Sequence, residues 1–492
     1  MSAKPRQETH PPGIDAKGTQ FKVVIVGGSI AGLTLAHCLS RAGIDYVVLE
    51  KRNEIAPQVG ASIGIMPHGG RIMDQLGLFD AVERLIEPLH TAHISYPDGF
   101  EHTNRSPMLL EKRFGLPLAF LERQKMLEVL YGHLPDPSRV LVGSAVVSVD
   151  QDDAGQASVC TGDGSIYKGD LVVGADGVHS CVRGQMWRLA DKLQPGLISK
   201  EEKTGQSVRM KIEYACVFGI SAGVPGLDVG EQITSLNDHR SYLVFPGKNG
   251  RIFWFLLRRL DQVYTYPDGP RYSTEDAERT CAKHANDHIW KGVRFADIWE
   301  KREVFSMTNL EEHVFQTWHY GRVVCIGDSM HKMAPNTGQG ANCAIEDAAA
   351  LTNLLIQALK SRPHGCKLSN QEVHGLLHTF NNDRLHRVRN IYKGASFVVR
   401  LQARYSLPLR LLGRYYLPHS GDLPADTASK VIAGAGDLEF LPPSQRLGPG
   451  WHRFRPKKHV LHSYTVGAMG LLLLLSAMTW LRQDLLRFLL HG

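Results

Sequence analysis

Short apolar runs alternate with amphipathic stretches over the first third of the chain. Residues 21–28 (FKVVIVGG) and 46–50 (YVVLE) have the composition of buried parallel strands, and residues 29–42 between them place apolar side chains at helical spacing. A β-α-β unit of this length is typical of an α/β nucleotide-binding domain. The same reasoning predicts helices over 68–87 and 121–134 and several strands over 139–177.

The pattern changes between residues 188 and 310. Residues 240–257 (RSYLVFPGKNGRIFWFLL) indicate two aromatic-rich strands around an Asn249-Gly250 turn. The buried-strand pattern returns at 321–328, and strong helical patterns follow at 341–359 and 380–415. The predicted fold class is therefore α/β: a Rossmann-like, doubly wound nucleotide-binding domain (21–187 and 311–415) interrupted by a β-sheet substrate domain (188–310).

The two ends of the chain differ from this core. Residues 1–20 are polar and are predicted to form a flexible tail, and residues 416–460, rich in Pro and Gly, a linker. The stretch from Tyr464 to Leu481 carries no charge, follows several basic residues and has Tyr464 and Trp480 near its ends. A membrane span needs roughly 17–25 apolar residues, so we expect a C-terminal membrane helix at 464–481. A buried helix and an interfacial helix are the alternatives.

Composition narrows the class of protein. The 492 residues exceed the size of one hydrophobic core, and 43% hydrophobic content excludes global disorder. The net charge of +7 is diffuse and no RNA-binding module is visible, so no nucleic-acid partner is expected. The eight cysteines lack zinc spacing, which predicts no metal site and favours a reducing compartment.

The first candidate for chemistry is the turn after residue 26. Gly27, Gly28, Ser29 and Gly32 form a glycine-rich turn that opens a helix, as pyrophosphate-binding turns do, although Ser29 replaces the middle glycine of the usual pattern. Glu50 ends the next strand, where a carboxylate binds adenosine ribose hydroxyls and repels a 2′-phosphate. The pair favours FAD or NAD over NADP as the resident nucleotide.

Two more motifs follow buried strands. The first is GADGVHSCVR (174–183), and the second is GDSMHKMAPNTGQGANCAIEDA (327–348). In the second, Asp328 is placed to bind polyol hydroxyls, and Gly338 and Gly340 free the backbone to lie against a flat ring. The helix starting near Ala341 and Asn342 would direct its positive end at that ring.

In this order and at these separations, the three motifs resemble those of FAD-dependent monooxygenases of the para-hydroxybenzoate hydroxylase type. The resemblance covers roughly residues 21–410 and implies FAD as cofactor, with NAD(P)H as a transient co-substrate. It implies a ribose contact for Glu50, a ribityl contact for Asp328 and a position beside the flavin ring for Ala341. The other residues that match the family's FAD-contacting or motif positions are Gly64, Arg123, Asp176, Pro335, Gly338, Gly340 and Asn342.

The chain is also similar to a narrower group, the fungal epoxidases that act on prenylated indole-diterpene or meroterpenoid precursors. This resemblance rests on segments such as GASIGIMPHG, FLERQKML and YACVFGIS and on the apolar C-terminus. It implies epoxidation of a terminal prenyl double bond by way of a flavin hydroperoxide, in secondary metabolism. Tyr214 matches a tyrosine of that group and is the candidate catalytic residue. The implied partners are an apolar prenylated substrate, O₂ and membrane lipid, with the catalytic domain on the cytoplasmic side, at the endoplasmic reticulum.

Two other functions remain open from the sequence. An aromatic-ring hydroxylase of the same fold, kynurenine- or phenol-hydroxylase-like, would be expected to place an Arg or Lys against an acidic substrate. A flavin protein that does not insert oxygen, a reductase or binding protein, belongs to a different class. A flavin halogenase is disfavoured because no W-x-W-x-I-P segment is present.

Overall fold

The computed structural model describes residues 21–58, 62–152, 155–199, 202–204, 207–360 and 367–453. The described elements belong to one compact unit that runs to His452. The segment 464–481, for which a membrane helix is expected, lies outside the described residues. In the described ranges, no helix has both the length and the apolarity to cross a bilayer.

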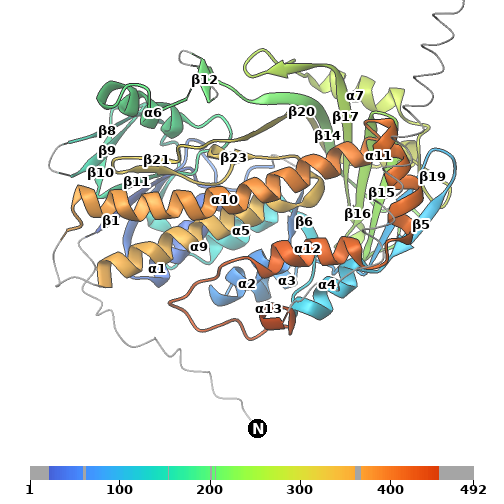
Figure 1. The fold of residues 1–492 in the computed structure, drawn as a ribbon, viewed down its shortest axis with the longest axis horizontal. Helices are drawn as coiled ribbons and strands as arrows, with labels where there is room; N and C mark the ends of the chain where they lie inside the picture. The colour runs from blue at the N-terminus through green and yellow to red at the C-terminus, as the bar shows by residue number, and fades with distance from the viewer. Residues whose placement is uncertain are drawn as a thin grey trace, which may run out of the picture. The chain divides into compact units, whose positions relative to one another are not determined.

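A six-stranded sheet carries the nucleotide-binding half, on the left in Figure 1. Its central strands are parallel and buried, and the Val and Ile side chains of β1 are almost fully enclosed. This continuous burial explains why the strands appear in the sequence as uninterrupted apolar runs. In sheet order, its strands are β21 (His319–Tyr320), β22 (Val323–Cys325), β11 (Leu171–Gly174), β1 (Lys22–Val26), β2 (Asp45–Leu49) and β7 (Val140–Leu141).

An eight-stranded sheet forms the second half, and its long strands lie on the right in Figure 1. One face packs on α7 (Thr274–Lys283) and α8 (Phe295–Glu300). The other face contributes to a separate apolar cluster with residues of the nucleotide-binding half. In sheet order, the strands are β23 (His331–Lys332), β20 (Arg302–Val314), β14 (Lys211–Ser221), β17 (Ile252–Thr265), β16 (Arg240–Pro246), β15 (Glu231–Asn237), β4 (Thr91–Ser95) and β5 (Glu101–Asn104).

Helices connect and cover these sheets. The long helix α10 contacts α9 and strands of both large sheets, and Figure 1 shows it running across the molecule. The main helices are α1 (Ile30–Arg41), α2 (Pro67–Gln75), α3 (Phe79–Glu83), α4 (Ser106–Phe114), α5 (Arg123–Gly132), α6 (Cys181–Leu193), α9 (Gln339–Lys360), α10 (Asn370–Gln402), α11 (Leu407–Leu411), α12 (Leu423–Ala433) and α13 (Gly450–Arg453).

The smaller sheets complete the fold. The three strands of a smaller sheet lie in the chain between β7 and β11 of the six-stranded sheet, and a short two-stranded sheet lies near the start of α2. Their strands are β8 (Val146–Gln151), β9 (Ala157–Thr161) and β10 (Ile166–Gly169), and then β3 (Ser62–Ile65) paired with β6 (Ala119–Glu122). The remaining pairs are β12 (Lys203–Thr204) with β13 (Ser207–Val208) and β18 (His288–Trp290) with β19 (Val293–Arg294).

Several boundaries differ from the sequence predictions. The helix expected over 68–87 is two helices, because Gly77 adopts φ +78° and ends the first. The helix expected from 121 begins at Arg123, since 119–122 form β6. The predicted hairpin is present as β16 and β17, and Asn249 adopts φ +59° in its turn.

The sheet predicted within 188–310 also takes in residues from outside that range. Strands β4 and β5 come from residues 91–104 and β23 from 331–332. Sequence pattern carries no information on which distant strands pair, so this extension was not foreseen. The part of the expected linker 416–460 that is described is not an open linker, because α12 packs on α4 through Ile432, Leu110 and Phe114.

Candidate active site

The glycine-rich turn between β1 and α1 is tightly packed. Gly27 has φ +108°, and a Cβ there would lie 2.4 Å from the carbonyl oxygen of Ala175. A Cβ on Gly32 would lie 1.9 Å from the carbonyl oxygen of Gly27. Both positions therefore exclude any side chain, and the start of α1 can approach the turn as closely as a pyrophosphate-binding turn requires.

The carboxylate of Glu50 closes this turn from β2. Its Oε2 accepts a hydrogen bond from the backbone N–H of Gly28 at 2.7 Å, and its Oε1 accepts from Arg52 N at 2.9 Å. Each carboxylate oxygen can accept more than one hydrogen bond, so Glu50 can also accept ribose hydroxyls. The structure thus brings Glu50 to the predicted ADP turn.

Arg123, at the start of α5, joins the same group. Its Nη2 donates to Ser29 Oγ at 2.8 Å. Burial lowers the pKa of Arg123, while Asp328 and Glu50 act in the opposite direction. That pattern places the guanidinium within electrostatic range of both carboxylates, so the first and third motifs converge at Arg123.

The second motif mainly organises the backbone. Asp176 Oδ1 accepts from Ser180 Oγ at 2.5 Å, and its Oδ2 accepts from Val182 N at 3.1 Å, at the start of α6. Burial raises the pKa of Asp176. Buried Arg183 donates to the carbonyl oxygen of Ser329 at 2.5 Å and so ties this motif to the third one.

The third motif begins at a turn that is hydrogen-bonded to helix α9. Asp347, on α9, accepts from Gly327 N at 2.9 Å and from His331 Nε2 at 2.7 Å. Asp328 forms an ion pair with Lys332. Burial opposes ionisation of Asp328, but the Lys332 ammonium outweighs it and lowers the pKa, so the side chain is a carboxylate at neutral pH.

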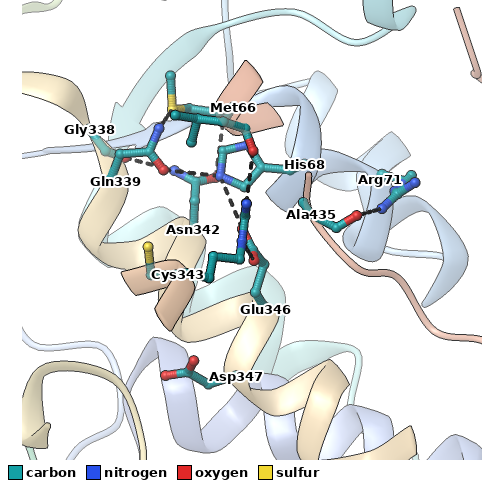
Figure 2. A network of polar contacts seen from close by, with 12 residues as sticks. Met66, His68, Arg71, Gly338, Gln339, Asn342, Cys343, Glu346, Asp347 and Ala435 are labelled. Atoms are coloured by element: carbon teal, nitrogen blue, oxygen red, sulfur yellow. Dashed lines mark hydrogen bonds and ion pairs between the residues drawn. The ribbon is translucent and has the colours of Figure 1, made fainter. Parts of the chain in front are cut away.

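The loop that follows is attached to the start of α9 and to β3. Gly338 has φ +63°. Asn342 Nδ2 donates to the carbonyl oxygens of Gly338 at 2.8 Å and Gly64 at 2.9 Å, and its Oδ1 accepts from Met66 N at 3.1 Å. Figure 2 shows Asn342 beside Gly338 and Met66 at the start of the helix. Asn342 therefore fixes the loop rather than standing free for a ligand.

His68 and Gln339 extend this network, as Figure 2 shows. Burial lowers the pKa of His68 to about 4, so the ring is neutral at pH 7. In the tautomer that the contact implies, its Nε2 donates to Gln339 Oε1 at 3.1 Å. The amide of Gln339 in turn donates to the sulfur of Met66 at 3.0 Å. The first turn of α9 is thus anchored to α2.

A buried ionic cluster lies one turn further along α9. Arg384 of α10 donates to Glu346 at 2.7 Å and to Asp347 at 2.6 Å, and Arg387 donates to both oxygens of Glu346. Glu346 is 2% exposed and Asp347 fully buried. This cluster was not predicted from the sequence, although the charged pair Glu346-Asp347 inside an apolar helical pattern is a signal for it.

The residues around the loop fit an FAD. A Cβ built on Gly338 would meet no atom within 4 Å, and one on Gly340 would meet only Asp328 Oδ1, at 3.9 Å. In the same loop, the buried Asn336 Oδ1 and Thr337 Oγ1 have no hydrogen-bond partner among the described residues. Open space bordered by unpaired polar atoms, glycine backbone and Asp328 suits a flat polar ring carrying a polyol chain.

Tyr214 lies elsewhere, on β14. It is 1% exposed, and its hydroxyl has no hydrogen-bond partner among the described residues. It belongs to the apolar cluster that also contains Met66 and Ala334, which come from the cofactor-side segments.

Together, the sheet order and the convergent glycine turns define a two-part flavoprotein of the monooxygenase class. A family model described as an FAD binding domain matches residues 20–393. The chain is 59% identical to the FAD-dependent monooxygenase spyC of Aspergillus fumigatus, over 95% of this chain and 98% of that protein. It is 62% identical to the FAD-dependent monooxygenase cle3 of Aspergillus versicolor, over 93% of each chain.

The chain belongs to the FAD-dependent monooxygenases of the para-hydroxybenzoate hydroxylase type, with FAD as its cofactor and NAD(P)H as the transient reductant. Solved structures support the same fold. HpxO of Klebsiella pneumoniae, complexed with FAD and uric acid, aligns with a TM-score of 0.69 at 21% identity, over 84% of this chain and 97% of that one. CtdE, in complex with FAD and a substrate, aligns with a TM-score of 0.62 at 19% identity, over 78% and 90%.

Proposed function

We propose that this monooxygenase epoxidises a terminal prenyl double bond of an apolar meroterpenoid or indole-diterpene precursor. The observation that carries the proposal is the apolar face of the eight-stranded sheet. Buried side chains from four of its strands join Met66 and Ala334, which border the cofactor loop. Among them Phe245 stacks on Phe120 with centroids 3.7 Å apart and meets Phe255 edge-on. An electron-rich alkene on a greasy chain suits such a surface.

The charges near this face favour an apolar substrate over an acidic one. A ring hydroxylase for an acidic substrate would need a cation free to bind the carboxylate. One cation near Tyr214 is Arg400, whose guanidinium carbon lies 5.8 Å from the ring centroid. Arg400 already donates to Glu213 at 2.5 Å, and a second carboxylate would have to compete with that pair.

The chain's own residues would hold and orient the reactants. Bound FAD supplies the oxygen activation, which no side chain can provide. Glu50, Arg123 and Asp328 would bind its polar parts, and the loop at Gly338 would support its ring. The apolar face would hold the prenyl chain and exclude water. This division of labour requires no nucleophilic side chain.

The test is a labelled incubation. Full-length protein in membranes is mixed with NADPH, ¹⁸O₂ and a farnesylated aromatic compound, and the product is analysed by mass spectrometry. We expect one ¹⁸O atom in an epoxide at the terminal double bond. Label in the aromatic ring would instead support the ring hydroxylase, and NADPH oxidation with no labelled product would support the flavin reductase.

We also propose that the segment 464–481 attaches the enzyme to a membrane, with the catalytic unit on the cytoplasmic side of the endoplasmic reticulum. The support is the uncharged sequence preceded by basic residues, together with a substrate that would partition into lipid. Membrane fractionation of the tagged protein tests it, and recovery of the full-length chain in the soluble fraction would contradict it.

A further inference from the structure

Two polar side chains share the apolar sheet face that the proposed substrate would contact. In the pairing of β14 with β20, Tyr214 lies opposite Leu310, and Glu312 follows two residues further along β20. Alternate residues of a strand point to the same side of a sheet, so Glu312 faces the same way as Leu310 and Tyr214. Diagonal neighbours of this kind have Cα atoms about 7–8 Å apart, within reach of one small group between their ends.

Both side chains are buried and lack hydrogen bonds. Tyr214 is 1% and Glu312 2% exposed. The Tyr214 hydroxyl and both carboxylate oxygens of Glu312 have no hydrogen-bond partner among the described residues. Buried polar atoms are nearly always hydrogen-bonded in folded proteins, and a buried carboxyl group without a hydrogen bond is costly even beside a cation. Two such groups on one face therefore indicate a missing ligand.

The neighbouring cations do not satisfy Glu312, because they serve Glu213. Arg400 Nη2 donates to Glu213 Oε2 at 2.5 Å, and Lys211 Nζ donates to the same oxygen at 2.7 Å. Arg400 stays 3.6 Å from Glu312 Oε2, an ion-pair distance beyond a hydrogen bond. Glu312 is thus partly neutralised but retains its capacity to accept hydrogen bonds.

The protonation of both groups is affected by burial. Burial raises the pKa of Tyr214, so at neutral pH the phenol keeps its proton and can donate it. Burial also raises the pKa of Glu312, while Arg400 and Lys211 act in the opposite direction. A partner that both donates and accepts a hydrogen bond matches this pair.

We propose that Tyr214 and Glu312 form the polar end of the substrate site and bind a hydroxyl group of an otherwise apolar substrate. The hydroxyl donates to Glu312 and accepts from Tyr214. This inference rests on the proposed function, because it assumes that the apolar sheet face receives the prenyl chain. It adds that the substrate class is a prenylated alcohol or phenol, recognised at a group remote from the reacting double bond.

The test compares a farnesyl-substituted phenol with its O-methyl ether, which cannot donate a hydrogen bond. Each is titrated into oxidised, full-length holoenzyme in detergent, and binding is followed by the flavin difference spectrum. No turnover is needed. We expect the wild-type protein to bind the phenol about tenfold or more tightly than the ether, because the ether cannot donate to Glu312 and leaves that buried acceptor without a hydrogen bond.

Substitutions test which residues cause the preference for the phenol over the ether. Glu312→Gln replaces the carboxyl group by an amide of the same size, which is a weaker acceptor, and we expect it to reduce the phenol-to-ether ratio about fivefold. Tyr214→Phe removes the donor and should also reduce the ratio. Glu311→Gln is the matched control, because Glu311 pairs with Ile212 of β14 on the opposite face and lies 3.8 Å from His179; the ratio should stay at the wild-type value.

The outcomes separate this inference from the proposed function. Equal binding of phenol and ether to the wild type, or an unchanged ratio in both Glu312→Gln and Tyr214→Phe, would overturn the hydroxyl site and leave epoxidation standing. If neither compound binds, both the apolar substrate and the hydroxyl site are wrong. If Glu312→Gln does not retain flavin, the Tyr214→Phe ratio decides.

Discussion

The buried cluster between α9 and α10 allows a quantitative test of what holds the cofactor loop. The perturbation is Glu346→Gln, which keeps the size of the side chain but removes its charge. Burial opposes ionisation of Glu346, yet the charges of Arg384 and Arg387 outweigh it and lower the pKa to about 2, from an ordinary value of 4.5. The shift corresponds to roughly 3 kcal/mol of unfolding free energy at pH 7.

The sign of the pH dependence follows from the direction of that shift. Because the pKa of Glu346 is lower in the folded state, its contribution is present above about pH 4.5 and is lost as the pH falls toward 2. The difference in unfolding free energy between wild type and Glu346→Gln should therefore be roughly 3 kcal/mol at pH 7 and about 1.4 kcal/mol at pH 3. Removing one member of a buried ion pair typically costs about 3–5 kcal/mol, a similar magnitude.

The assay is urea unfolding of the full-length protein in detergent at several pH values, followed by tryptophan fluorescence. Glu128→Gln is the matched control, because Glu128 pairs with Lys125 at the surface, where both side chains are more than 40% exposed. Surface pairs contribute about 0–1 kcal/mol. A Glu346→Gln protein as stable as the control at pH 7, or a loss that does not vary with pH, would refute the electrostatic account.

Three further predictions concern the cofactor turns and the C-terminus. Gly32→Ala should abolish flavin retention, because the added methyl group overpacks the pyrophosphate-binding turn at a cost of about 1–3 kcal/mol. The control Gly184→Ala has no atom within 4 Å of its added Cβ and should retain full flavin absorbance. Asn342→Ala loses three hydrogen bonds and should weaken FAD binding about tenfold or more, measured as the flavin-to-protein ratio after dialysis; an unchanged ratio would contradict its anchoring role. Truncation after Arg453 keeps Trp451, whose Nε1 donates to the carbonyl oxygen of Phe114, and should move a folded, yellow protein to the soluble fraction.

The buried ionic cluster between α9 and α10 affects both the stability of the protein and the cofactor loop on which the proposed function depends. Glu346 and Asp347 lie less than three turns from the start of α9, and Asp347 also holds the turn that presents Asp328. A loss of charge here should loosen the loop around Gly338 as well as lower stability. Flavin affinity and unfolding free energy should therefore fall together in Glu346→Gln, whereas substitutions at the substrate face should change binding preference alone.

The glycine turns and the buried strands could be predicted because their signals are local. Close contacts within a short β-α turn and with the adjacent strand require glycine at positions 27 and 32. The burial of β1 and β2 is visible in the sequence as continuous apolar runs. Glu50 lies at the turn because it directly follows β2, a strand whose length carries the side chain there. The sequence signals for these features lie within a few residues or within one regular element, although the close contact of Gly27 with Ala175 comes from the end of the distant strand β11.

The contacts of Asn342, Arg384 and Glu312 could not be predicted from local sequence patterns. Asn342 bonds to a residue 278 positions earlier, and the Glu312 oxygens lack a hydrogen bond among the described residues because Arg400 donates to Glu213 instead. No spacing rule encodes such contacts, because they arise when two sheets and α10 pack against each other. Local chemistry thus identified a flavin enzyme, whereas long-range packing set which charges are satisfied, which face is apolar and where a substrate hydroxyl can bind.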